Sequence, residues 1–313
     1  MKFSLYLLSI AYLFISCTKQ DATTQTIDNN ASEQKTINLK VDGIDRSFVI
    51  YLPTGYKNAG KMPMIFVLHG GTGTPEGMIN LANFKPIADR DKVVLVYPAG
   101  IQNNWNDGRP TTPNQLGIND VSFFNQMCDY MITNYSVDGT KIYATGISNG
   151  GFMSARLGCE LSNRIAAIAV DAATIEATTI APNCNPNNPV PAIFIHGTLD
   201  TFCPFNGGTV STGAGGTILS HFQAIDKWVA INNCNSTPIV TDLPDISNDG
   251  TTIKQRIYSG GTNNTEVVSY VILNGGHTWP QGLQYLPENI IGKTSQDMNG
   301  CEVIWVFFKR FKR

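Results

Sequence analysis

Apolar residues occur along this chain mostly in short unbroken runs rather than in strict alternation. Such runs are typical of strands that are covered on both faces, as in a parallel sheet. They lie at residues 62–68, 93–97, 141–145, 165–170 and 192–195. Residues 37–53 instead show two alternating runs around Asp42-Gly43, which predicts a hairpin. The pattern therefore predicts a buried sheet preceded by a hairpin.

Segments with the spacing of amphipathic helices separate these runs. They cover residues 77–90, 120–135, 149–161, 217–232 and 294–311. Two further strands are expected at residues 252–258 and 266–273. Pro86 is expected to kink the first helix. Strands that alternate with helices predict the α/β class, with a mostly parallel central sheet and helices on both faces. We expect residues 37–313 to form one domain.

The N-terminus has the pattern of an export signal. Met1-Lys2 precedes an apolar run over residues 3–15, which is too short to span a bilayer but suits a signal peptide. Ser16-Cys17 resembles the lipobox of bacterial lipoproteins, in which the cysteine becomes the acylated N-terminus. We expect residues 1–17 to be such a signal, with Cys17 lipidated. Cleavage near Ser16 with full release is the alternative.

Residues 18–36 contain almost no large apolar side chains. So little buried surface cannot offset the entropy lost on ordering, and we expect a flexible polar tether here. Both interpretations of the N-terminus export the protein, either anchored at the cell envelope or released. A membrane is expected as a partner only through the lipid anchor.

Composition narrows the choice of partners. Hydrophobic residues make up 42% of the chain, which is enough for a large core. Only 15% of residues are charged and the net charge is −2, so the chain lacks the basic stripe of a nucleic-acid-binding protein. With four histidines and no Cys-x-x-Cys motif, we expect no structural metal site.

The seven cysteines fit an exported protein. Without Cys17 an even number remains, which permits three disulfides. Cys159 and Cys184 are close in sequence and bracket one strand and loop, so we favour that pair.

The strongest local motif is Gly146-Ile147-Ser148-Asn149-Gly150, which matches the Gly-x-Ser-x-Gly pattern of a nucleophile elbow. A buried strand leads into the motif and a helical pattern follows it. The tight turn needs small residues because neighbouring segments approach closely. The alternative is an ordinary glycine-rich turn, but the context favours Ser148 as a nucleophile.

A serine nucleophile needs a base that a carboxylate orients. His69 and His196 lie at strand ends before glycines, and His221 lies within a helical pattern. That leaves His277, in a loop after a late strand, as the base. Asp200 follows the strand at 192–195 and is the preferred acid. Asp171, after the strand at 165–170, is its competitor.

The reaction also needs backbone donors for the oxyanion. One is expected to be the N–H of Asn149, at the start of the helix after the nucleophile. The other should come from the loop His69-Gly70-Gly71-Thr72-Gly73, where glycines let the backbone approach a substrate closely. We choose the Thr72 N–H, with Gly71 as the alternative.

Several motifs together resemble those of secreted poly(3-hydroxybutyrate) depolymerase-like and feruloyl-esterase-like hydrolases. They span nearly all of the chain after the tether and are highly specific in combination. In chain order they are His69-Gly70-Gly71, Tyr97-Pro98-Ala99-Gly100, Trp105-Asn106-Asp107-Gly108-Arg109, Asn119-Asp120-Val121, Gly146-Ile147-Ser148-Asn149-Gly150-Gly151, Cys159-Glu160, His196-Gly197-Thr198-Leu199-Asp200 and Gly276-His277-Thr278-Trp279-Pro280.

This resemblance implies an α/β-hydrolase fold and hydrolysis of esters by Ser148, Asp200 and His277 without a cofactor. It also implies a Cys159–Cys184 disulfide. The chain departs from the family at Cys203, and it lacks the cysteine that relatives often carry near residues 258–261. The pairing of the remaining cysteines therefore stays open; these are Cys128, Cys203, Cys234 and Cys301.

Two tryptophans are expected to wall the substrate cleft. Trp279 lies two residues from the base, and Trp105 lies in a family motif; an aromatic ring could stack on a feruloyl group or a sugar. The alternative is that each ring only packs its own loop. Three charged residues, Asp107, Arg109 and Asp120, are expected to form ion pairs that fix loops.

The sequence therefore predicts a carboxylic ester hydrolase that acts on plant cell-wall esters or short hydroxyacyl oligomers. We expect no attached substrate-binding module, which would make crystalline polyester a less suitable substrate. An exported serine peptidase of the same fold and a non-catalytic surface binding protein are the alternatives.

Overall fold

A ten-stranded mixed sheet forms the centre of the computed structural model, which describes residues 30–210 and 213–313. Its strand order is β1-β2-β4-β3-β5-β6-β7-β12-β11-β10. The middle strands from β4 to β12 are parallel, and both edges are antiparallel. The strands are β1 (Glu33–Val41), β2 (Ile44–Leu52), β3 (Met62–Leu68), β4 (Val94–Pro98), β5 (Val137–Ile147), β6 (Ile165–Asp171), β7 (Ala192–Gly197), β10 (Ile239–Asp242), β11 (Thr252–Tyr258) and β12 (Val267–Leu273). A separate two-stranded sheet pairs β8 (Gly208–Thr209) with β9 (Thr217–Ile218).

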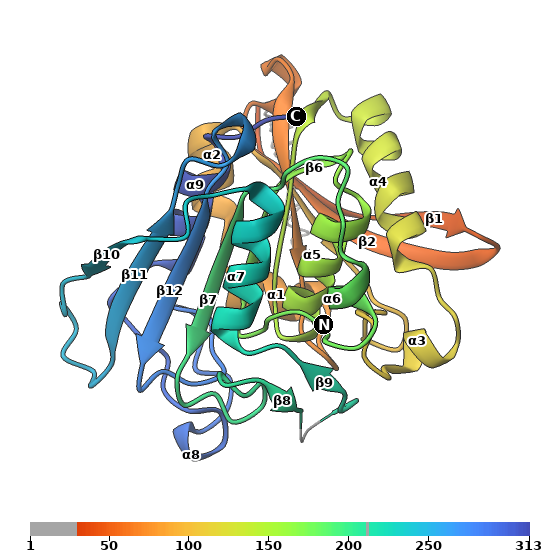
Figure 1. Cartoon of the computed structure of the whole chain (residues 1–313). Helices are drawn as coiled ribbons and strands as arrows, with labels where there is room; N and C mark the ends of the chain where they lie inside the picture. Colours follow the sequence, from red (N-terminus) through yellow and green to blue (C-terminus); the bar gives the residue numbers. More distant parts are fainter. Residues whose placement is uncertain (1–29, 211–212) are drawn as a thin grey trace, which may run out of the picture.

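Helices cover both faces of the large sheet, as predicted (Figure 1). On one face α4 (Asp120–Asn134), α5 (Asn149–Glu160) and α7 (His221–Asn232) bury apolar residues such as Phe124, Phe152 and Trp228. On the other, α1 (Pro75–Leu81), α2 (Lys85–Asp91) and α9 (Gly300–Phe308) do the same. The shorter helices are α3 (Thr112–Gln115), α6 (Ile180–Asn183) and α8 (Glu288–Ile291), with 3₁₀ turns η1 (Tyr56–Asn58) and η2 (Thr262–Asn264).

Three of the predicted helices have different limits. The segment 77–90 is not one kinked helix but two, because the backbone leaves the helical region at Ala82. Pro86 lies in the first turn of α2, where its missing N–H costs nothing. Residues 217–218 form β9, and α7 begins at His221 behind a Ser220 capping box. The closing helix is limited to α9, after the cap Asn299.

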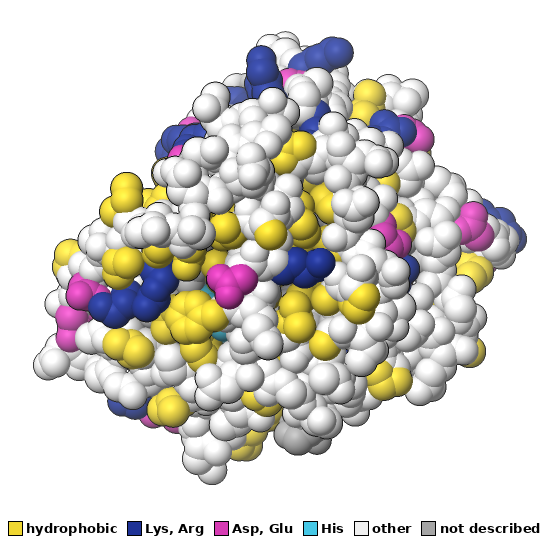
Figure 2. Space-filling view, viewed as in Figure 1, with side chains coloured by type: hydrophobic (Ala, Val, Ile, Leu, Met, Phe, Trp, Pro, Cys, Tyr) yellow, Lys and Arg dark blue, Asp and Glu magenta, His cyan; other side chains and the backbone are white. Residues whose placement is uncertain are grey.

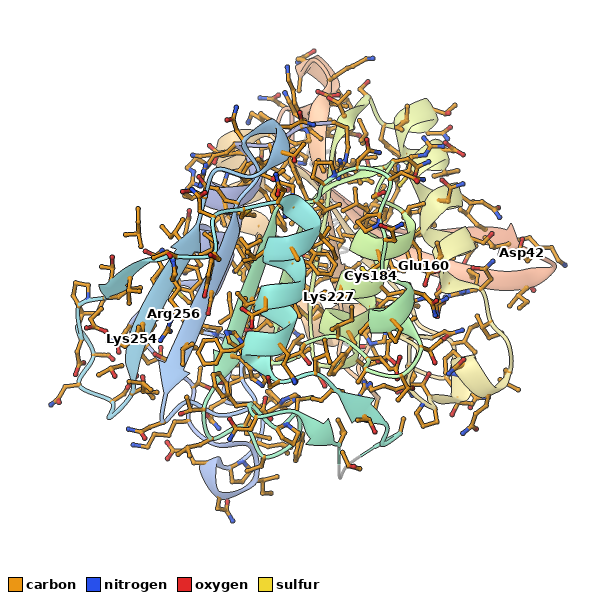
Figure 3. The ribbon with its side chains drawn as sticks, in the orientation of Figure 1. Asp42, Glu160, Cys184, Lys227, Lys254 and Arg256 are labelled. Carbon is orange, nitrogen blue, oxygen red and sulfur yellow. A yellow bond between two sulfur atoms is a disulfide. The ribbon has the colours of Figure 1, made fainter. Side chains whose placement is uncertain are left out.

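The hairpin and one disulfide agree with the sequence. Strands β1 and β2 pair around the tip at Asp42 (Figure 3), and β1 begins at Glu33, within the segment expected to be a tether. Cys159 and Cys184 form a disulfide, with their Cα atoms 4.9 Å apart. The three disulfides that the cysteine count permits do not all form, because Cys128, Cys203, Cys234 and Cys301 are free.

Residues 1–29 lie outside the described residues, and with them the predicted signal, the lipidation at Cys17 and most of the tether. In the part of the chain that is described, no helix is long and apolar enough to cross a bilayer.

On the face shown in Figure 2, acidic and basic side chains are scattered among polar and apolar ones.

Candidate active site

Ser148 occupies a sharp turn between β5 and α5. Its φ of 55° and ψ of −123° are strained for a residue with a side chain, and its N–H donates to the carbonyl of Asp171 at 2.9 Å. The turn requires glycine beside it. A Cβ at Gly150 would lie 2.5 Å from the carbonyl oxygens of Leu68 and His69. The motif therefore requires glycine at this position, because β3 and the start of α5 are in close contact.

His277 and Asp200 are brought together by neighbouring parallel strands. Asp200 follows β7 and His277 follows β12, and these two strands are paired. The Nδ1 atom of His277 lies 2.8 Å from Oδ2 of Asp200. Oδ1 of Asp200 accepts hydrogen bonds from the backbone N–H groups of Phe202 at 2.8 Å and Cys203 at 2.7 Å.

The electrostatics favour a charged pair at this point. Burial alone would raise the pKa of Asp200, but the charge of His277 and hydrogen bonds from His196 and His277 hold it well below its usual range. Burial alone would lower the pKa of His277, but the charge of Asp200, the nearby Cys203 thiol and the hydrogen bond with Asp200 raise it well above its usual value.

Asp171, the competitor for the acid, is placed differently. It ends β6 and is buried, and its Oδ2 has no hydrogen-bond partner among residues 30–210 and 213–313. Burial raises the pKa of this carboxyl well above its usual value, which favours the neutral form. The carboxylate that bonds His277 is therefore that of Asp200.

Ser148 and His277 line the same cavity, which has a volume of about 660 Å³. Much of its wall is apolar, from side chains that the sequence analysis did not single out. They are Met78, Leu81, Phe202, Val210, Leu283, Tyr285 and Leu286. The loop at 283–286 has no helical or strand periodicity, so no sequence pattern could have assigned it to the site.

The choice of Thr72 as an oxyanion donor is wrong. The Thr72 N–H donates to the carbonyl of Asn103 at 2.8 Å and is not free. The alternative, Gly71, lines the cavity, and a Cβ there would lie 3.8 Å from the Cβ of Asn149. Asn149 also lines the cavity, and it begins α5, where N–H groups have no partner within the helix.

The expectation that two tryptophans wall the cleft is also wrong. Trp105 is fully buried, and its Nε1–H donates to the carbonyl of His69 at 2.9 Å. Trp279 is 1% exposed and packs edge-on against Phe84. Neither ring lines the cavity of Ser148. Both rings instead pack inside the fold, against residues of other segments rather than only against their own loops.

Buried ion pairs fix the loop of residues 104–109, as expected. Arg109 pairs with Asp107 at 2.6 Å, and Arg46 pairs with Asp120 at 2.7 Å. Asp107 also accepts a hydrogen bond from Asn149 Nδ2 at 2.6 Å, and the Trp105 N–H donates to Asn149 Oδ1 at 2.8 Å. The loop therefore holds the residue that follows Ser148.

The described residues contain no group of three or more His, Cys, Asp or Glu side chains arranged to hold a metal ion. The chemistry that the site offers is that of a serine, a histidine and a buried carboxylate beside an apolar cavity.

Comparisons with known proteins find esterases. No family model matches the chain. A protein described as an esterase, NocK of Nocardia uniformis, is 26% identical over 251 residues, which cover 77% of this chain and 72% of that protein. Feruloyl esterase B of Piromyces equi is 26% identical over 196 residues, 62% of this chain but only 37% of that protein. The acetyl xylan esterase from Aspergillus awamori superposes with a TM-score of 0.58 at 14% identity, covering 80% of this chain and 96% of that structure.

The fold is that of the α/β-hydrolases, as the resemblance implied. The chain is homologous to proteins named feruloyl esterase and esterase, and these relatives support a serine carboxylic ester hydrolase.

Proposed function

We propose that the protein is an exported serine carboxylic ester hydrolase with Ser148 as nucleophile, His277 as base and Asp200 as the acid that orients it. One observation carries the proposal. A serine in a strained elbow and a histidine bonded to a buried carboxylate line a single cavity. The same residue types stand in the chain order that this fold uses, Ser then Asp then His.

In the proposed mechanism, Asp200 accepts the Nδ1–H of His277 and so leaves Nε2 free to take a proton. His277 removes the proton of the Ser148 hydroxyl as its oxygen attacks the ester carbonyl. The N–H groups of Asn149 and Gly71 hold the resulting oxyanion. His277 then returns the proton to the leaving alcohol, and a water molecule releases the acid from the acyl-enzyme by the same steps.

The residues that line the cavity favour an ester substrate that carries both an apolar group and polar groups. On one side α1 packs closely against the loop at 281–286. The approach is so close that a Cβ added at Gly282 would lie 2.8 Å from the carbonyl oxygen of Leu81. This side contributes Met78 and the leucines of that loop. Asn104, Arg109 and Thr111 line another part. We propose feruloyl or acetyl esters of polysaccharides as substrates, and short hydroxyalkanoate esters as a further class.

We also propose export, with Cys17 as the lipidated residue. The Cys159–Cys184 disulfide supports an oxidising compartment. Labelling of cells with a palmitate analogue should mark the wild-type protein, and Cys17→Ser should abolish the label. Label that persists in the Cys17→Ser variant would contradict the proposed anchor.

The decisive experiment measures hydrolysis of p-nitrophenyl acetate, p-nitrophenyl butyrate and methyl ferulate by the wild type and by Ser148→Ala. We expect ester hydrolysis that falls by about 10⁴-fold or more in the variant, and fluorophosphonate labelling of Ser148. Faster turnover of peptide anilides than of esters would favour a peptidase instead. Folded protein that neither hydrolyses esters nor takes the label would contradict the esterase and favour a binding protein.

A further inference from the structure

A second histidine contacts the carboxylate that His277 uses. His196 lies near the end of β7 and is buried. Its Nε2 atom is 3.3 Å from Asp200 Oδ2, the same oxygen that bonds His277 Nδ1 at 2.8 Å. One carboxylate oxygen is therefore in contact with two imidazole rings.

His196 also holds the turn that carries the carboxylate. Its Nε2 lies 2.9 Å from the carbonyl oxygen of Cys203. The N–H of Cys203 in turn donates to Oδ1 of Asp200. A single imidazole thus contacts Oδ2 directly and also contacts the carbonyl of Cys203, the residue whose N–H holds Oδ1.

The surroundings determine which nitrogen of His196 carries hydrogen. Both oxygen atoms near Nε2 are acceptors, so Nε2 must be the donor. Nδ1 is buried and has no hydrogen-bond partner within the described part of the chain. A hydrogen on Nδ1 would have no acceptor there, whereas one on Nε2 has two, so the surroundings favour a hydrogen on Nε2.

Four residues face the His196 ring. They are Asp200, Cys203, His221, whose ring centroid is 5.6 Å away, and Phe205, at 5.3 Å. Burial, then His196 and Arg256, lower the pKa of His221 well below its usual value, so His221 adds no charge. The Nε2 contact orients Asp200, whose negative charge stabilises the imidazolium that forms on His277.

We propose that His196 is a positioning residue that acts through Asp200: its Nε2–H holds Oδ2 where that oxygen accepts the Nδ1–H of His277. The inference rests on the proposed role of Asp200. Without His196, Oδ1 would keep its backbone donors from Phe202 and Cys203, whereas among the described residues Oδ2 would keep only His277.

The test is a double-mutant cycle with p-nitrophenyl acetate, in the full chain. His196→Leu is expected to lower kcat about tenfold and to leave KM unchanged, since one buried hydrogen bond to a charged group is lost. His196→Gln places an N–H donor near the position of Nε2 and should retain most of the activity. In an Asp200→Asn background, His196→Leu should cause little further loss, because the group through which it acts is already gone.

His221→Leu is the matched control. His221 is buried beside His196, but its Nε2 contacts the Ser269 hydroxyl at 2.7 Å rather than Asp200. Its substitution should lower the melting temperature with no comparable change in kcat. If His196→Leu does not fold, His196→Asn replaces it, because the shorter amide does not reach Oδ2.

Two results would overturn the inference. One is an equal loss of kcat on His196→Leu in both backgrounds, and the other is a folded His196→Gln as impaired as His196→Leu. Failure of the proposed function would look different: Asp200→Asn or Ser148→Ala alone would then keep the wild-type rate.

Discussion

At the scale of single residues, the site depends on groups whose properties are set by burial and by their neighbours. His277 and Asp200 are both buried, and each shifts the other's pKa toward the charged form. Asp171 is also buried, but its Oδ2 has no hydrogen-bond partner in the part of the chain that the structure describes, and its pKa shifts the opposite way. Burial and neighbours therefore favour the anion of the same residue type after β7 and its neutral form at the end of β6.

The pH dependence of the reaction should show this coupling. In the proposed mechanism, attack by Ser148 needs neutral His277, whose pKa is raised above its usual value of 6.5. We expect kcat/KM to rise with pH through a midpoint above 6.5. Asp200→Asn removes the negative charge, so the midpoint should move to lower pH. A profile of kcat/KM for p-nitrophenyl acetate measures both, and an unchanged or higher midpoint in the variant would refute the coupling.

We expect Asp107 to contribute to the stability of the fold as well as to the position of Asn149 in the elbow. Its carboxylate pairs with Arg109 and accepts the amide of Asn149. Asp107→Ala leaves a buried arginine without its partner, which should lower the free energy of unfolding by about 3–5 kcal/mol. Denaturant unfolding measures this. Asp45→Ala is the control, because that side chain is 92% exposed, and it should change stability by less than about 0.5 kcal/mol. Equal stability of the two variants would contradict the expectation.

At the scale of elements, the elbow exists because β5, β3 and α5 approach each other without side chains between them. The glycines of the motif provide this approach, since backbone atoms of β3 and of the residue after it lie where a Cβ of Gly150 would be. The loop of residues 104–109 then fixes Asn149, the first residue of α5.

Gly150→Ala should therefore damage both fold and activity. The added methyl would meet two backbone carbonyl oxygens that cannot move independently of the sheet. We expect a loss of at least about 1–3 kcal/mol in the free energy of unfolding, together with most of the esterase activity. Gly60→Ala is the matched control, because nothing lies within 4 Å of a Cβ there. Thermal unfolding and p-nitrophenyl acetate hydrolysis compare them, and a tolerated Gly150→Ala would contradict this account of the elbow.

At the scale of the whole molecule, the cavity is assembled from segments that are far apart in the sequence. The glycine loop after β3, helix α1, the loops after β7 and the segment 283–286 all contribute to its wall. Leu283 is 60% exposed although it lines the cavity. Apolar surface that is both exposed and concave is typical of a ligand site.

Leu283→Gln should change the preference for substrates without loss of the fold. Because the side chain is largely exposed, its replacement removes contact with the substrate rather than core packing. We expect kcat/KM for methyl ferulate to fall by about 3- to 10-fold relative to p-nitrophenyl acetate. Leu116→Gln, 57% exposed and absent from the cavity wall, should leave the ratio unchanged. Equal ratios in the two variants would remove Leu283 from the substrate site.

Most of the fold could be predicted because its signals are local. The unbroken apolar runs correspond to β3 to β7, and the alternating runs correspond to the β1–β2 hairpin. Helix ends were harder, because caps such as Ser220 and the break at Ala82 depend on single residues within a continuing pattern. Strand β10 was missed because it is exposed throughout and carries no burial pattern.

The sequence by itself selected the groups that we propose to react: Ser148 in its elbow, His277 by elimination, and Asp200 ahead of Asp171. Motif, chain order and strand ends are all local properties, and α/β topology brings strand ends together. Tertiary structure alone decided which atoms are free to act. The Thr72 N–H donates to the carbonyl of Asn103, Trp279 packs against Phe84, and Leu283 lines the cavity. Whether a donor is free or a ring meets the cavity depends on partners that are distant in sequence.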